Sequence, residues 1–249
     1  MALTVNANKI TKSGVPYYAV SYMGVDRLRI HARSSCYFKN RQIGCHFCGI
    51  DTDGNFSMAD IKEVLDTYKS NSEIQHFLVG GGSFNPSDDF QTVLQIVKYI
   101  HETFKRNIYL MSIPPIDAKI LFKLKKAGVT EVAFNLEIYD RIRAKEIMPG
   151  KGNISLKRYD TAFQTAVNIW GKNGNVRSAL IVGLEPKEST IQGIEYLCRI
   201  GVSPILALFK PDGNMEDYLA PSSEEVLYIW ETAEKICRQY LVIIVKTTF

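Results

Sequence analysis

The chain has 249 residues, of which 46% are hydrophobic and 22% charged, and its formal net charge is +4. This composition is typical of a folded globular protein and excludes disordered, collagen-like and low-complexity classes. A chain of this length buries enough apolar surface to fold without a disulfide framework, and its mild positive charge does not by itself indicate a nucleic-acid partner.

The expected compartment is the cytoplasm. The N-terminus lacks the apolar stretch of a secretory signal, and no apolar run approaches the roughly 20 residues that a membrane helix needs. We therefore expect no membrane association, and we expect the five cysteines to be reduced thiols or metal ligands rather than disulfides.

Strand-type and helix-type segments alternate along the chain. Expected strands cover 27–32, 74–79, 108–113, 131–136, 176–182 and 204–209, with a further short strand at 241–245. Expected helices cover 57–70, 88–104, 117–127, 155–170, 190–200 and 223–238, the first opened by a capping box at Ser57. Six strand–helix units without a linker predict one α/β domain over 1–249, with a core at about 27–215 and a C-terminal helix and strand at 222–249. The sheet is expected to be parallel, either open or curled into a barrel.

Three of the five cysteines crowd the loop after the first expected strand. Cys36, Cys45 and Cys48 have the spacing C-x8-C-x2-C. Thiolates so close together bind soft metals, because a shared positive centre offsets their mutual repulsion. Structural zinc normally takes four ligands; the fourth could be His46, His31 or a remote residue, so zinc stays open at this point.

This loop resembles the cluster loop of the radical S-adenosylmethionine (radical SAM) superfamily. The resemblance implies that Cys36, Cys45 and Cys48 hold three irons of a [4Fe–4S] cluster, and that the amino and carboxylate groups of SAM bind the open iron. Cys45-His46-Phe47-Cys48 matches the C-x-aromatic-C ending of the family's loop, where the aromatic residue packs near the adenine. Most members have three residues between the first two cysteines, whereas this chain has eight.

A glycine-rich turn, Gly80-Gly81-Gly82-Ser83, closes the second expected strand. Consecutive glycines let the backbone approach a ligand closely, although a plain flexible turn explains the same residues. The turn resembles the family's GGE-like motif, which contacts the SAM amino group. Because Gly82 and Ser83 replace the usual acid, the main chain or the serine hydroxyl would have to make that contact here.

Asn135 and Glu137 end the fourth expected strand. The alternation of a strand turns both side chains to the same side, and an amide beside a carboxylate suits ribose hydroxyls or an ammonium group. A solvated strand end is the alternative. In the biotin synthase and lipoyl synthase branch of the family, which this region resembles, an Asn followed two residues later by an acid binds SAM.

Two later strands carry the remaining candidates for the cofactor site. Arg177 opens the fifth strand and is the candidate for a bidentate clamp on the SAM carboxylate, with plain surface charge as the alternative. The segment around Gly183 resembles the fifth-strand segment of that branch, where the backbone passes the adenine. The sixth strand, including Leu208, resembles the segment whose main chain contacts the adenine edge.

A basic stretch between Arg141 and Lys151 follows Glu137. Solvated charge is its default interpretation. Its resemblance to the corresponding segment of lipoyl synthase-like enzymes implies substrate contact at most.

The resemblance implies a partial (β/α)6 barrel and an enzyme that reductively cleaves SAM at the cluster. The resulting 5′-deoxyadenosyl radical would take a hydrogen atom from a small-molecule or carrier-bound substrate, after electron delivery by a low-potential flavodoxin or ferredoxin. No catalytic acid, base or hydrogen donor is assigned to a residue.

Cys198 and Cys237 lie in separate expected helices and are predicted to be isolated, buried residues. They supply no second cluster, which speaks against sulfur insertion by this chain alone and leaves open a second protein subunit that supplies sulfur. The rival class is a non-enzymatic zinc or iron–sulfur module attached to RNA. Basic and aromatic residues interleave only locally at 37–41, so we expect no nucleic-acid partner.

Overall fold

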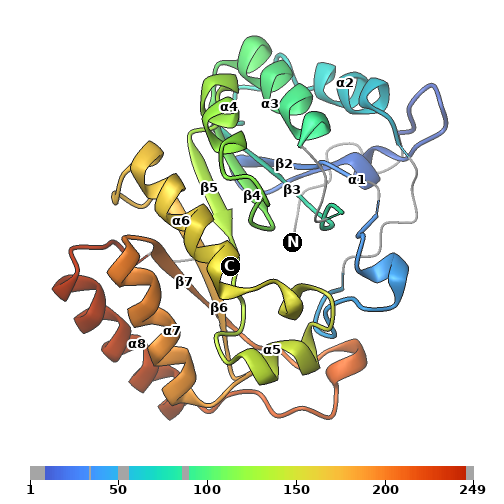
Figure 1. The fold of residues 1–249 in the computed structure, drawn as a ribbon. Coiled ribbons are helices and arrows are strands. Elements are labelled where there is room, and N and C mark those ends of the chain that lie inside the picture. The colour runs from blue at the N-terminus through green and yellow to red at the C-terminus, as the bar shows by residue number, and fades with distance from the viewer. Residues whose placement is uncertain (1–8, 34, 50–55, 86–89, 245–249) are drawn as a thin grey trace. The chain divides into compact units, whose positions relative to one another are not determined.

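The computed structural model describes residues 9–33, 35–49, 56–85 and 90–244. It is an α/β fold in which the strands form one mostly parallel open sheet in the order β1-β2-β3-β4-β5-β6-β7 (Figure 1). This order, with helices between successive strands from β2 onward, confirms the expected fold class of a partial α/β barrel. The chain divides into two compact units, 1–40 with 50–132 and 41–49 with 133–249, and each is described by itself.

Unit 1 contains the first four strands. Strand β1 (Ser21–Met23) pairs antiparallel with β2 (Arg27–His31), and β3 (His76–Gly80) and β4 (Asn107–Ser112) follow in parallel. Its helices are α1 (Tyr17–Val20), α2 (Met58–Asp66), α3 (Gln91–Phe104) and α4 (Ile120–Ala127), and a 3-10 turn, η1 (Lys39–Arg41), lies at its boundary. Helix α3 packs on β4 and contacts both α2 and α4. It does so through residues spaced three and four apart, which are fully buried: Val93, Ile96, Val97 and Ile100.

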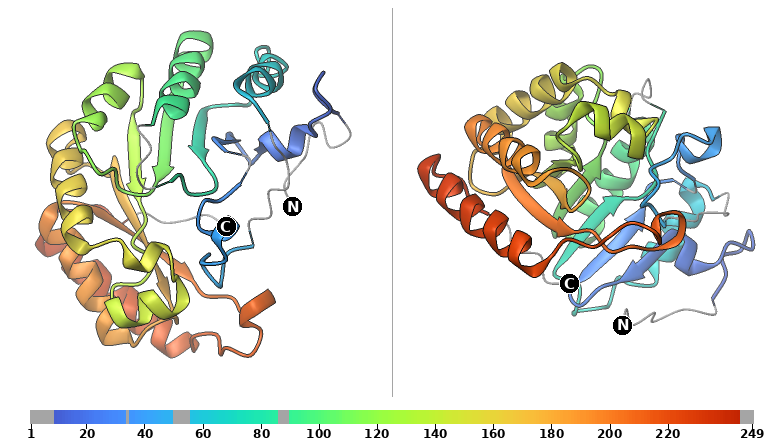
Figure 2. Two further views of the ribbon diagram at one scale, coloured as in Figure 1. Left: turned by 45° about the vertical axis from the view of Figure 1, so that its right-hand side comes forward. Right: turned by 90° about the horizontal axis from the view of Figure 1, so that it is seen from below.

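Unit 2 contains β6 (Val176–Val182) and β7 (Ser203–Leu208), which pair in parallel, while β5 (Glu131–Phe134) crosses the boundary between the units in sequence. Its helices are α5 (Arg141–Ile147), α6 (Leu156–Trp170), α7 (Lys187–Ile200) and α8 (Ser223–Gln239), with 3-10 turns η2 (Lys151–Asn153) and η3 (Gly213–Met215). Helices α6, α7 and α8 lie along one side of β6 and β7 (Figure 2). Six of the seven β6 residues are buried, as is typical of a strand covered on both faces.

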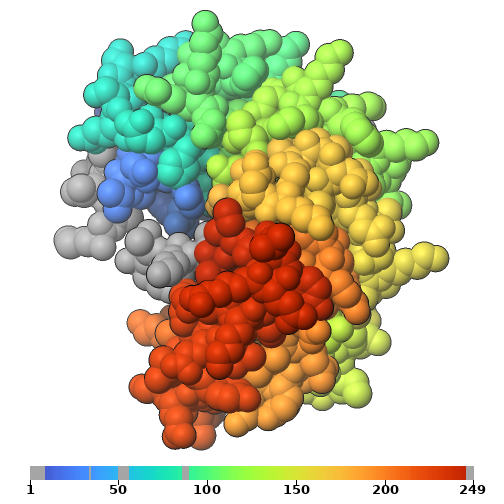
Figure 3. Space-filling model, turned by 90° about the vertical axis from the view of Figure 1, so that its left-hand side faces the viewer, coloured from blue at the N-terminus to red at the C-terminus, as the bar shows by residue number. Residues whose placement is uncertain are grey.

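Helix α8 lies on the surface of unit 2 beside α7 (Figure 3). Cys198 on α7 and Cys237 on α8 are 1% and 2% exposed. They are buried, as predicted, but the prediction that they are isolated is wrong, because their sulfur atoms lie 3.5 Å apart. Sequence separation concealed this contact, which arises only when the two helices pack.

The sequence missed three short elements and predicted one strand that is absent. Helix α1 and strand β1 have only 4 and 3 residues, too few for a period to show, and α5 was hidden in the basic stretch. Residues 241–244 are not a strand, and residue 245 lies outside the described residues. Leu241 has a left-handed φ of 55°, and the N–H of Val242 donates to the carbonyl of Cys237, so the chain folds back on the end of α8.

No described helix has both the length and the apolar character needed to cross a membrane.

Asp60 ties the N-terminal segment to the start of α2. The predicted capping box is present, since the side chain of Ser57 accepts from the Asp60 N–H and the Asp60 carboxylate accepts from the Ser57 N–H. The hydroxyls of Thr11 and Ser13 also donate to this buried carboxylate. Burial alone would raise the pKa of Asp60, but the hydrogen bonds from Ser13, Ser57 and Thr11 outweigh it and hold the pKa well below its usual range.

We expect Asp60→Asn to lower the free energy of unfolding at pH 7 by about 1–3 kcal/mol, because a charge-assisted network loses its acceptor. The wild-type advantage should be complete above the unfolded-state pKa of about 3.9 and should decline as the pH falls through the lower folded-state pKa. Urea unfolding of both proteins at pH 7 and pH 3 measures this difference. Asp217→Asn, at an exposed position, is the control, and equal stability of Asp60→Asn and wild type at pH 7 would contradict the prediction.

Candidate functional site

The second and third cysteines of the loop lie in a short turn of unit 2. The N–H of Cys48 donates to the carbonyl of Cys45 at 3.1 Å, and both side chains are half-buried. Two main-chain hydrogen bonds fasten this segment to the connection after α5. The His46 N–H donates to the Ile147 carbonyl at 2.9 Å, and the Gly150 N–H donates to the Ile43 carbonyl at 2.8 Å. The turn is therefore held at both ends by backbone contacts.

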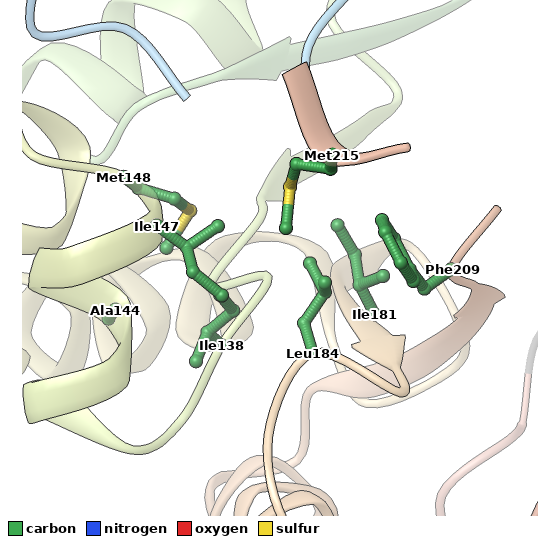
Figure 4. Packing of buried hydrophobic residues seen from close by; sticks show 8 residues of the cluster. All are labelled: Ile138, Ala144, Ile147, Met148, Ile181, Leu184, Phe209 and Met215. Carbon is green, nitrogen blue, oxygen red and sulfur yellow. The ribbon is translucent and has the colours of Figure 1, made fainter. Parts of the chain in front are cut away.

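A cluster of buried apolar residues supports this turn. Its members come from α5 and the residues on either side of it, from the ends of β6 and β7, and from the segments that follow these strands: Ile138, Ala144, Ile147, Met148, Ile181, Leu184, Phe209 and Met215 (Figure 4). Cys45 and Phe47 are partly buried against it. Phe47, predicted to lie near an adenine ring, thus packs beside Cys45 on an apolar surface of unit 2.

The glycine-rich turn contacts Cys36 within unit 1. Gly80 ends β3, and Gly81 has a φ of 111°, a left-handed conformation that favours glycine. A Cβ on Gly82 would lie 2.7 Å from both the Cα and the N of Cys36. The Ser83 carbonyl accepts from the N–H of Tyr37, next to Cys36, at 2.9 Å. The absence of a side chain at Gly82 is what allows the backbone to approach the first cysteine.

The three loop cysteines fit an iron–sulfur cluster by their donor chemistry. All three are half-buried cysteines outside any disulfide, and a thiolate is the ligand type that such clusters take. Cys36 belongs to unit 1, and Cys45 and Cys48 belong to unit 2. Among the described residues no three His, Cys, Asp or Glu side chains gather to hold a metal ion.

The two histidines considered as a fourth zinc ligand differ in their surroundings. His31 is half-buried in unit 1 and its Nδ1 lies 3.0 Å from the Ala19 carbonyl; burial lowers its pKa. His46 is exposed in unit 2.

Asn135 and Glu137 continue β5 along β6 beyond the last strand residue. The Asn135 side-chain oxygen accepts from the Ala179 N–H at 3.1 Å, so this side chain serves the sheet. The Glu137 N–H donates to the Ala179 carbonyl, and its own carbonyl accepts from the Ile181 N–H, both at 2.8 Å. Two residues predicted to share one role are therefore used differently.

Lys151, the last residue of the basic stretch, forms an ion pair with Glu137 that the sequence did not predict. Its Nζ lies 3.1 Å from Glu137 Oε1, and the two side chains are only 11% and 14% exposed. Burial alone would lower the pKa of Lys151, but the charge of Glu137 and its hydrogen bond, together with the nearby Tyr159 and Cys45, outweigh burial and raise that pKa. Tyr159, fully buried beside this pair, donates to the Asn135 carbonyl at 3.2 Å, and burial raises the pKa of its phenol. The one sequence signal for this ion pair is an acidic residue at the end of a strand followed by a lysine 14 residues later.

The other basic residues of this stretch make local structural contacts. Arg141 donates to the carbonyls of Gly152 and Ile154 and so holds η2. Arg143 donates to the Leu184 carbonyl at 3.0 Å and pairs with Glu146. The stretch is therefore neither simply solvated nor free to contact substrate along its whole length.

The structure brings Gly183 and Leu208 to the same edge as Glu137 but does not bring Arg177 there. Leu208 ends β7, is 51% exposed and pairs with Val182, next to Gly183. Arg177 lies at the opposite end of β6, six residues before Gly183 and roughly 20 Å away along a strand. Its Nε donates to the Gly174 carbonyl at 2.6 Å, in the turn that enters the strand.

A family model described as the Radical SAM superfamily matches residues 40–217. The match includes Cys45 and Cys48 and the ends of β5, β6 and β7, but it begins after Cys36.

Among curated proteins, the chain is 24% identical over 255 residues to bacteriochlorophyllide c C-7(1)-hydroxylase of Chlorobaculum limnaeum, covering 90% of this chain and 62% of that protein. It is 26% identical over 178 residues to the probable dual-specificity RNA methyltransferase RlmN of Clostridioides difficile (strain 630), covering 66% of this chain and 52% of that protein. The chain thus spans less than two thirds of the length of either relative.

Solved structures share the fold. Methylornithine synthase (PylB) superposes with a TM-score of 0.63 at 18% identity, covering 88% of this chain and 70% of that one. Streptococcus suis SuiB bound to S-adenosylmethionine superposes with a TM-score of 0.68 at 14% identity, covering 92% and 51%.

We expect Gly82→Ala to lower the free energy of unfolding by about 1–3 kcal/mol, because the new methyl group would collide with the backbone of Cys36. It should also increase the alkylation rate of Cys36, measured by mass spectrometry of its peptide. Gly49→Ala is the matched control beside the other two cysteines. A Cβ there meets no atom within 4 Å, so its effect should stay within about 0.5 kcal/mol. An equal effect of both substitutions would contradict this account of the turn.

Proposed function

Because the chain belongs to the radical SAM superfamily, whose members use a [4Fe–4S] cluster and SAM, we propose that it is an enzyme that cleaves SAM reductively. The observation that carries the proposal is the family match over residues 40–217, which contains the Cys45–Cys48 turn. When bound, the cluster and SAM supply a 5′-deoxyadenosyl radical that removes a hydrogen atom from substrate.

Cys36, Cys45 and Cys48 are the proposed cluster ligands. Three thiolates leave one iron without a protein ligand, so SAM has a place to bind. The apolar cluster against which Cys45 and Phe47 pack keeps water from one side of the turn. Charge-assisted contacts made there are stronger than they would be in water.

The proposed SAM contacts divide by chemistry. The turn from Gly80 to Ser83 offers main-chain groups and a hydroxyl to the methionyl amine. The Glu137 carboxylate suits a ribose hydroxyl or the amine, and its half-buried position at the end of β5 makes such a bond worth more than one in solvent. Gly183 and Leu208 offer backbone at the edge proposed for the adenine.

The reaction class proposed is hydrogen abstraction from a small-molecule or carrier-bound substrate, with electrons from a low-potential flavodoxin or ferredoxin. Sulfur insertion from a second cluster in this chain is not proposed. Such a cluster needs three or four protein ligands, and Cys198 and Cys237 supply two thiols buried against each other.

The decisive experiment is anaerobic reconstitution followed by electron paramagnetic resonance of the reduced protein with and without SAM. We expect about four irons per chain, a signal that changes when SAM is added, and slow formation of 5′-deoxyadenosine. Near-stoichiometric zinc with no iron uptake would overturn the proposal in favour of a structural zinc module, and eight irons per chain with sulfide lost to product would return it to sulfur insertion.

Cys45→Ala should abolish the cluster, because two thiolates do not hold it. Cys198→Ala is the matched control, since it removes a thiol of the same chemistry that lies between α7 and α8 rather than in the loop. Iron and sulfide are measured per chain in both variants. Retention of four irons in Cys45→Ala would show that the ligand assignment is wrong.

Glu137→Gln should weaken SAM binding about tenfold while leaving the iron content unchanged, because a charge-assisted hydrogen bond is replaced by a neutral one. The Arg177 clamp implied by the resemblance is tested in the same titration. The Arg177 bond to the Gly174 carbonyl predicts that Arg177→Ala loses less affinity than Glu137→Gln. The reverse order would place the SAM carboxylate at Arg177 and contradict the assignment drawn from the strand ends.

A further inference from the structure

Lys151 belongs to a turn that connects two parts of the proposed site. The connection from Ile147 to Lys151 accepts from the His46 N–H at one end and donates through the Gly150 N–H to the Ile43 carbonyl near the other. One residue later, the Lys151 ammonium pairs with Glu137 at 3.1 Å. The same short turn therefore touches the segment that carries Cys45 and the carboxylate proposed to bind SAM.

This turn is held firmly in place. A Cβ on Gly152 would lie 2.2 Å from the Ala144 carbonyl oxygen, so the backbone of η2 sits directly on α5. The Gly152 N–H donates to the Met148 carbonyl at 2.6 Å, and Arg141 donates to the Gly152 and Ile154 carbonyls. Lys151 therefore projects from a fixed backbone, and its Nζ has a defined position.

Glu137 has an unusual backbone as well. Its φ of 65° is left-handed, which is costly for a residue other than glycine, and such conformations persist where surrounding contacts enforce them. Hydrogen bonds to Ala179 and Ile181 fix this backbone, while the ion pair fixes the carboxylate. Main chain and side chain are thus both determined by neighbours.

We propose that Lys151 is a positioning residue. It holds the Glu137 carboxylate in the orientation that SAM requires and at a fixed position relative to the turn that carries Cys45. The inference rests on the proposed function. A purely stabilising role explains the pair poorly, because desolvation of two buried charges offsets most of their attraction. The geometry instead places the Lys151 ammonium at a fixed position beside the Glu137 carboxylate, where it orients that carboxylate.

The test is a double-mutant cycle on SAM affinity, measured with reconstituted protein containing Lys151→Met, Glu137→Gln or both substitutions. Lys151→Met should weaken SAM binding about tenfold. Because Lys151 acts through Glu137, the double variant should bind SAM no more weakly than the weaker single variant. Lys151→Arg restores a cation and should stay within about threefold of wild type.

Lys145→Met is the matched control, because Lys145 is an exposed lysine on α5, six residues earlier in the sequence. It should leave SAM affinity and thermal stability unchanged. Thermal unfolding of the cluster-free variants verifies that each is folded, and Lys151→Gln replaces Lys151→Met if the latter does not fold.

Two outcomes would overturn the inference. Additive losses of SAM affinity in the double variant would mean that Lys151 acts independently of Glu137. Wild-type affinity in both Lys151→Met and Lys151→Gln would mean that the ion pair does not position the carboxylate. Failure of the wild-type protein itself to bind SAM would instead contradict the proposed function, so the two failures are distinguishable.

Discussion

The extension of β5 along β6 is the constraint on which the arrangement of Glu137 and its neighbours in unit 2 depends. After Phe134 the chain leaves regular strand, yet Asn135 and Glu137 continue to exchange hydrogen bonds with Ala179 and Ile181. These bonds hold a non-glycine residue at positive φ. Without these hydrogen bonds the backbone of Glu137 would not be fixed. The position of its carboxylate relative to Lys151 and to the Cys45 turn would then not be fixed either.

Backbone contacts help to place the loop residues in both units. In unit 1 the missing side chain of Gly82 lets the glycine turn touch Cys36. In unit 2 the bonds from His46 and Gly150 hold the segment with Cys45. Backbone attachment does not use the sulfur atoms, and none of the three cysteines forms a disulfide. It also explains why a site built on loops does not need a regular element at the cysteines.

The sequence predicted the regular elements well, because they have readable periods. The bounds of β6 are those expected, and Ser155 and Ser57 cap α6 and α2 as serines at helix starts do. The helices α1 and α5, each shorter than two turns, and the three-residue strand β1 were missed, since no period develops over so few residues. The resemblance singled out the glycine turn and Phe47, and the structure places the turn against Cys36 and Phe47 against the apolar cluster that also contacts Cys45. Contacts between segments distant in sequence, Lys151 with Glu137 and Cys198 with Cys237, were not predicted, because residue type and spacing do not show which segments pack together.

Arg177 and Asn135 show where strand alternation stops being informative. Alternation assigns a residue to a face of the sheet, but it does not say which partner the side chain meets. Arg177 lies at the start of β6, where its side chain donates a hydrogen bond to the Gly174 carbonyl. Asn135 is expected on the same face as Glu137, but its amide oxygen accepts a hydrogen bond from the Ala179 N–H. In a parallel sheet the carboxyl ends of strands form the functional edge. Glu137, Gly183 and Leu208 lie at that edge in unit 2, so position along the strand, more than residue type, separates candidate ligands from residues that hold the sheet together.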